Sequence, residues 1–193
     1  MGKDHPEAGY IATKELRDYM GTEECDAMFR KKMLLNREDT ENIVSNGVWA
    51  NFQPKFDITL QLYNYYPFFE RIVRHIIDTH VEQNVWIVEF RHIFGMVIDE
   101  EYKPIGVERE LEIFDRVLSQ VREEHPDFQM RIINCGLKAV PGGHCQTQVD
   151  YTIQALKHEK YRHMIAGYDM VMEEEICDPI ETFFDMIHKA RTD

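Results

Sequence analysis

Apolar residues recur every three or four positions over much of the chain, which predicts helices. The clearest example lies between residues 67 and 82, where charged side chains occupy the positions opposite the apolar ones. This spacing predicts an amphipathic helix. Pro67 fits its first turn, since an N–H there would have no partner within the helix. The segments 22–34 and 39–47 are also predicted to be helical, and the polar residues 1–20 to form an arm.

The period changes in the second half of the chain. Residues 85–90 form a short, nearly continuous apolar run, which is typical of a parallel strand that is covered on both faces. Two similar runs, at 130–135 and 164–170, predict two further strands. Helices are predicted between and after the strands, at 107–124, at 147–159 and from Asp178 onwards.

This alternation of strands and helices predicts an α/β fold. Connections of this length join parallel strands and cross over in the right-handed sense. A closed barrel of this type needs eight strands. We therefore expect a partial (β/α) TIM-barrel-like unit with three parallel strands, preceded by an all-helical N-terminal region. The expected division is an N-terminal arm and helices at 1–46 and the (β/α) domain at 47–193.

Composition narrows the classes of partner. The 193 residues include 35 Asp and Glu against 22 Lys and Arg, a formal net charge of -13. Such acidity argues against nucleic acid as a partner, because binding to phosphates needs a basic surface. We expect no membrane-spanning segment and no signal peptide, and the four cysteines show no C-x-x-C spacing. An intracellular, cytoplasmic protein is expected, with an organellar or secreted location left open.

Candidate site residues lie where the predicted strands end, because α/β proteins place their sites at the carboxyl ends of strands. Glu89 and Arg91 end the first strand, and Asp169 lies in the third. An ion pair between Glu89 and Arg91 that braces the strand end is the simpler interpretation of the first two.

A weak metal-site candidate lies in the loop after the second strand. His144 and Cys145 follow a Pro-Gly-Gly sequence, and Cys135 lies ten residues earlier. A zinc site needs three or four converging ligands, with one pair commonly close in sequence. The sequence has no H-x-H, H-E-x-x-H or C-x-x-C motif, so we expect no metal centre here, with His144 and Cys145 as loop residues and Cys135 at the end of the second strand.

Four short motifs, in this order, resemble the adenosine deaminase superfamily over residues 47–184, and in particular its adenosine deaminase-related growth factor subgroup. They are the helix start Tyr65-Tyr66-Pro67-Phe68-Phe69, the strand at 84–91 that ends in Glu-Phe-Arg, the step Glu124-His125-Pro126-Asp127-Phe128, and the strand Ile165-Ala166-Gly167-Tyr168-Asp169-Met170-Val171. Their common order makes the resemblance more specific than any single motif.

The resemblance implies a zinc (β/α) barrel in which a metal-activated water attacks C6 of a purine. The family's first strand carries His-x-His, whereas His5 is the one histidine before Gly47. The chain stops after the strand that matches the family's fourth, before the catalytic Glu and the later ligands. Glu89, Arg91, Asp169 and Met172 are then remnants of a substrate pocket, and no catalytic residue is assigned. Met172 stands where the family has a glycine that lets the backbone approach the purine.

Two functions are expected from this comparison. The first is a catalytically inactive, adenosine deaminase-like chain that acts as a structural or interaction subunit, with other protein subunits covering the open edge of its sheet and with no cofactor of its own. The alternative is the central segment of an active zinc-dependent adenosine deaminase, completed by a longer precursor or a companion chain. An independent three-stranded binding module is a third possibility.

Overall fold

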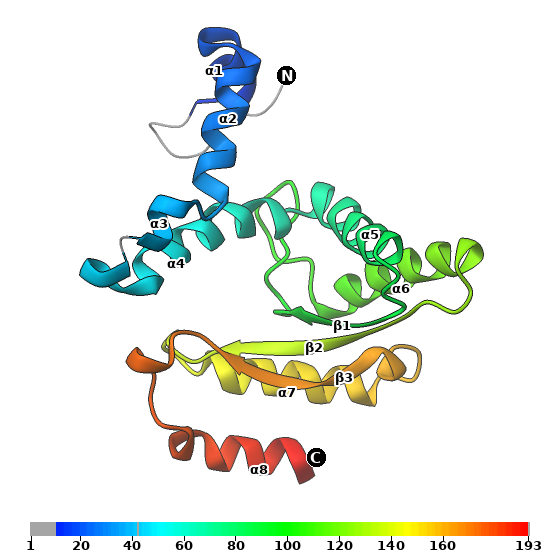
Figure 1. Cartoon of the computed structure of the whole chain (residues 1–193). Helices are drawn as coiled ribbons and strands as arrows, with labels where there is room; N and C mark the ends of the chain where they lie inside the picture. Colours follow the sequence, from blue (N-terminus) through cyan, green and yellow to red (C-terminus); the bar gives the residue numbers. More distant parts are fainter. Residues whose placement is uncertain (1–10, 42, 193) are drawn as a thin grey trace. The chain divides into compact units, whose positions relative to one another are not determined.

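The computed structural model describes residues 11–41 and 43–192, and these divide into two units (Figure 1). The first comprises Met1–Gln61 and the second Leu62–Asp193. The sequence-based boundary at residue 47 stays a prediction. Within the described ranges, no helix is both long enough and apolar enough to cross a bilayer.

The first unit is helical. Its helices are α1 (Thr13–Met20), α2 (Thr22–Met33), α3 (Arg37–Glu41) and α4 (Ile43–Tyr63), of which the last continues into the second unit. Two expectations are corrected here. Residues 13–20 form a helix rather than part of a polar arm, and residues 1–10 of that arm lie outside the described residues. Gly47 does not end a helix, because α4 continues through it and through Pro54.

Local polar contacts explain why the polar segment before α2 is helical. The N–H of Gly21 donates to the carbonyl of Arg17 and so closes α1. Arg17 also reaches across to α2, where its Nη2 lies 2.6 Å from Oδ1 of Asp26. Cys25 of α2 is fully buried. Helix α1 thus contacts α2 through residues that an apolar period does not reveal.

The second unit carries the sheet. Its elements are α5 (Tyr66–Glu82), β1 (Ile87–His92), α6 (Val107–Glu124), β2 (Gln129–Leu137), α7 (His144–Lys157), a 3₁₀ turn (Arg162–Met164), β3 (Ile165–Val171), two further 3₁₀ turns (Glu174–Ile176 and Ile180–Phe183) and α8 (Phe184–Thr192). The strands lie in the order β1-β2-β3, and both pairings are parallel. The predicted partial (β/α) unit with three parallel strands is confirmed. Pro67 lies in the first turn of α5, as predicted.

Helices α5, α6 and α7 all cover the same face of the sheet. Val88, Met130 and Ile132 point to this side and pack with Phe69 of α5 and Phe114 of α6 in one core. In Figure 1, β3 passes in front of α7. The expectation that the first strand is covered on both faces is wrong, since 72% of Ile87 is exposed. Within the described part of the second unit no helix lies on the other face, so the apolar run reflects only one packed side of this unit.

A buried carboxylate fixes the connection between β1 and α6. Glu110 of α6 is fully buried. Its oxygens accept hydrogen bonds from Nε2 of His92 at 2.9 Å and from the N–H groups of Gly95 and Val97 at 3.1 Å. The hydroxyl of Tyr63 donates to Nδ1 of the same histidine at 2.8 Å. Burial raises the pKa of Tyr63 well above its usual value, which keeps that proton in place.

A second buried network holds the same loop to β2 and α7. Oδ1 of Asn134 accepts the N–H of Phe94 at 3.1 Å, and its Nδ2 donates to the carbonyl of Gln148 and to Oγ1 of Thr152. Nε2 of Gln148 donates in turn to the carbonyl of Phe94. Because buried polar groups are costly without partners, these bonds leave the loop little freedom.

A bulge in β3 decides which of its side chains face the helices. Ile132 pairs with Ile165, but Ile133 pairs with Gly167, so Ala166 is an extra residue. One extra residue moves every later side chain of a strand to the opposite face. After the bulge, Tyr168 lies on the helix-covered face and Asp169 on the other. A regular strand would have placed them the other way round.

We expect Asn134→Ala to lower the free energy of unfolding by about 2 to 3 kcal/mol, because it removes the bonds to Gln148 and Thr152 and leaves the buried N–H of Phe94 without a partner. Urea unfolding followed by circular dichroism measures this loss. Gln129→Ala, an exposed substitution on the same strand, is the control and should change the value by less than about 0.5 kcal/mol. Equal effects of the two variants would contradict a stabilising role for Asn134.

Candidate functional site

The candidate functional site is the face of the sheet that carries no described helix of the second unit, and we call it the uncovered face. Strand pairing places Glu89 beside Arg131, Arg91 beside Ile133, and Cys135 beside Asp169. Side chains in register on parallel strands point to the same side. The uncovered face is therefore formed by Ile87, Glu89, Arg91, Gln129, Arg131, Ile133, Cys135, Leu137, Gly167, Asp169 and Val171.

An ion pair spans this face from one edge strand to the other. Nε of Arg91 on β1 donates to Oδ2 of Asp169 on β3 at 3.0 Å, across the central strand. Asp169 raises the pKa of the guanidinium, mainly through this hydrogen bond. The Arg91 side chain is 61% exposed and that of Asp169 37%, so the pair is accessible from solvent. Such exposed pairs add little to stability.

The partner of Arg91 differs from the simpler interpretation of the sequence. That interpretation joined Arg91 to Glu89 on the same strand, whereas the structure joins it to Asp169, 78 residues later. Glu89 lies instead in register with Arg131. The structure therefore brings Arg91 and Asp169 together and leaves Glu89 further down the same face. Their role as pocket remnants stays a prediction.

Cys135 lies on the central strand, next to Asp169 in the register and beneath the path of the ion pair. Its side chain is almost completely buried although it belongs to the uncovered face. Burial, together with the charge of Asp169, raises the pKa of this thiol from 9.0 to about 11. At neutral pH the group is a protonated thiol and a poor nucleophile.

Met172 follows β3 directly and has an unusual backbone conformation. Its φ is 136°, in the region where glycine is favoured and side chains are strained. This is the position where the resemblance to adenosine deaminases expects glycine. The backbone thus has a glycine-like conformation here, although a methionine is present.

The three metal-site candidates lie on different sides of β2. Cys135 faces the uncovered side, whereas Cys145 on α7 packs with Val149 and Met186 on the covered side. Nδ1 of His144 accepts the N–H of Leu137 at 3.1 Å, and burial lowers the pKa of its imidazole. Over residues 11–41 and 43–192, no three His, Cys, Asp or Glu side chains are grouped as metal ligands would be. The described residues therefore do not fit a zinc site.

The raised pKa of Cys135 predicts a loss of stability at alkaline pH. The unfolded chain releases this proton near pH 9 and the folded chain only near pH 11, so the free energy of unfolding falls as pH rises between these values. We expect the wild-type chain to lose about 2 kcal/mol more than Cys135→Ala between pH 8 and pH 11, measured by urea unfolding at each pH. Equal losses of stability in the wild type and in Cys135→Ala would contradict the raised pKa of Cys135.

Comparison with known proteins shows a distant similarity to adenosine deaminases. No family model matches the chain. The adenosine deaminase of Aedes albopictus is 24% identical over 194 residues, which cover 96% of this chain and 34% of that protein. The adenosine deaminase of Phlebotomus duboscqi is 23% identical over 177 residues, which cover 90% of this chain and 34% of that protein. The chain is thus adenosine deaminase-like in sequence, and it spans about a third of the length of these relatives.

Proposed function

We propose that this chain is a non-catalytic, adenosine deaminase-like subunit that packs the uncovered face and open edges of its sheet against another polypeptide. The observation that carries the proposal is the one-sided sheet. Parallel sheets are stable when both faces are covered, either by helices or by closure into a barrel. Here α5, α6 and α7 cover one face, and no described helix of the second unit covers the other.

The charges of the uncovered face support a protein partner. Glu89, Arg91, Arg131 and Asp169 alternate in sign across the three strands. Opposite charges arranged in this way favour a surface with complementary charges and disfavour other partners. Strands β1 and β3 also each have a free edge within the sheet, where another strand can add.

Met172 supports the absence of catalysis. In the family that this chain resembles, a glycine at this position lets the backbone approach the purine. The methionine adds a side chain at a backbone position with φ of 136°. We infer that this side chain takes space that a purine would otherwise fill. The growth factor subgroup of the superfamily is the one we propose for the chain, on the four motifs described above.

The alternative function is the central segment of an active, zinc-dependent adenosine deaminase that the rest of a longer polypeptide or a companion chain completes. One observation favours it: the chain matches only 34% of each relative. Because the described residues do not fit a zinc site, the ligands would have to come from outside them. The uncovered face would then line the interior of the completed barrel.

We expect the purified chain to show no conversion of adenosine to inosine, with or without added zinc. Absorbance of the nucleoside measures this, and an active adenosine deaminase is the control. Restored activity on addition of a companion chain from the native source would favour the alternative function. Zinc-dependent turnover by the chain alone, lost in Asp169→Asn, would overturn the proposal.

We also expect the chain to be isolated from its source in a larger particle, detected by native mass spectrometry. Arg131→Asp on the uncovered face should weaken the association about tenfold, because it reverses a charge at the interface. Lys157→Asp makes the same change at the exposed end of α7 and should leave the association unaltered. A monomer in the native source, or equal effects of both variants, would exclude this interface.

Replacement of Met172 tests the glycine-like backbone separately from function. We expect Met172→Gly to raise the free energy of unfolding by about 1 kcal/mol, because glycine relieves the strain at this φ. Met172→Ala keeps a Cβ atom and should give no such gain. Urea unfolding of the two variants makes the comparison, and a gain from alanine equal to that from glycine would contradict the explanation by strain.

A further inference from the structure

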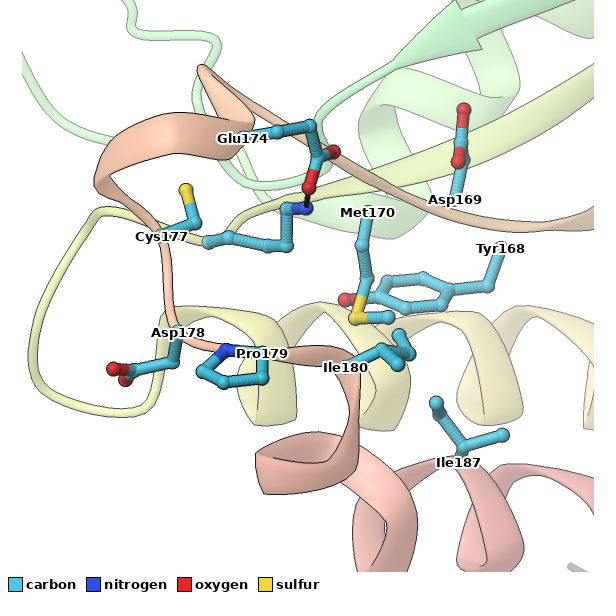
Figure 2. A pocket seen from close by; sticks show the side chains of 10 residues that line it. Tyr168, Asp169, Met170, Glu174, Cys177, Asp178, Pro179, Ile180 and Ile187 are labelled. Atoms are coloured by element: carbon cyan, nitrogen blue, oxygen red, sulfur yellow. Dashed lines mark hydrogen bonds and ion pairs between the residues drawn. The ribbon is translucent and has the colours of Figure 1, made fainter.

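A pocket of about 550 Å³ lies between β3 and the chain that leads into α8, on the helix-covered side (Figure 2). We call it the α8 pocket. Its wall combines residues from β3, from the loop that follows and from α8. It is within the size range of pockets that bind small molecules. The pocket shares only Asp169 with the uncovered face, and the inference drawn from it does not depend on the function proposed above.

One part of the pocket is apolar. Tyr168 and Met170 of β3 face Ile180 and Ile187, which point toward them from the segment that contains α8 (Figure 2). The hydroxyl of Tyr168 donates to the carbonyl of Cys145 at 3.2 Å, which fixes the ring. This part can therefore hold an apolar group without rearrangement of the tyrosine.

The polar part of the pocket contains a buried cation. The side chain of Lys138, which follows β2, is only 7% exposed. Its ammonium forms an ion pair with Glu174, which lies in the 3₁₀ turn after β3 and is marked by the dashed line in Figure 2. A buried ammonium needs an anionic partner, since removal from water otherwise costs several kcal/mol.

The two members of this ion pair differ greatly in exposure. The Glu174 side chain is 76% exposed, against 7% for Lys138. The carboxylate can therefore move into water at little cost to itself, whereas the lysine stays buried and needs another anion in its place. Another carboxylate that enters the pocket can take the same place on the ammonium.

The other carboxylates of the lining do not oppose an anion there. Asp169 points away from Tyr168 and Met170 (Figure 2) and is paired with Arg91 on the uncovered face. Asp178 points outward at the rim in the same view. The charge that an entering ligand meets at the inner end is that of Lys138.

We propose that the α8 pocket binds a small carboxylate with an apolar body, whose carboxylate replaces Glu174 on Lys138. The apolar body lies between Met170 on one side and Ile180 and Ile187 on the other. Glu174 acts as a tethered competitor that occupies the cation while no ligand is bound. When a side chain of the protein blocks the site in most molecules, the apparent affinity for a ligand falls in proportion to the fraction of molecules whose site is open.

The test uses octanoate as the probe and isothermal titration calorimetry of the full chain. We expect Glu174→Gln to bind octanoate about tenfold more tightly than the wild type, because the competing carboxylate is gone. Glu175→Gln is the matched control: it removes the same charge from the adjacent exposed residue and should bind like the wild type. Lys138→Met should lower the affinity of the Glu174→Gln chain about tenfold or more.

Two further probes, one without the charge and one without the apolar body, test the polar and apolar parts of the pocket separately. Octanol lacks the carboxylate and acetate lacks the apolar body, so both should bind at least tenfold more weakly than octanoate. Thermal melting of each variant shows that it is folded, and the comparison of Glu174→Gln with Glu175→Gln decides the matter even where Lys138→Met does not fold. Equal affinities of these two glutamine variants, equal binding of octanol and octanoate, or no binding of octanoate to Glu174→Gln would overturn the proposal.

Discussion

The buried carboxylate of Glu110 is the constraint on which the end of the sheet depends. It is removed from water and satisfied by the His92 ring and by two N–H groups of the β1–α6 loop. Loss of one of these partners would cost a few kcal/mol of stability, because the group is buried. The loop, α6 and the end of β1 therefore hold one another in place. Arg91 precedes His92 in the strand and points to the opposite face. The hydrogen bonds of His92 and Glu110 on the covered side therefore also fix the position of Arg91 on the uncovered side.

The sheet as a result has two very different faces. The covered face is lined by two clusters of buried apolar residues, whereas the uncovered face carries alternating charges with only one described ion pair, Arg91 to Asp169, across it. The α8 pocket adds a third environment at the edge of β3, where Lys138 is buried beside apolar side chains. A surface for a protein partner and a pocket for a small molecule can thus lie on one strand without sharing side chains other than Asp169.

The sequence predicts the local elements well and the long-range pairings poorly. The helical period and Pro67 predict α5 because both signals lie within the segment itself. The continuation of α4 through Gly47 has no such local signal, and α1 depends on contacts with its neighbour. In the sequence, Glu110 cannot be told from an exposed acidic residue of a helix, because its three hydrogen-bond partners lie on other segments. The pairing of Arg91 with Asp169 depends on the β-bulge, which no pattern of residues in the sequence predicts.

The bulge at Ala166 also bears on how this strand can change during evolution. The extra residue decides which face of the sheet each later side chain of β3 occupies. Deletion of its single codon would therefore exchange the side chains of the two faces in one step. Tyr168 and Met170 would be presented to the solvent side, and Asp169 would be turned into the apolar layer. Substitutions alter such a surface one position at a time, whereas a change of length replaces it whole. The chemistry of both faces is thus inherited together, through the length of the strand.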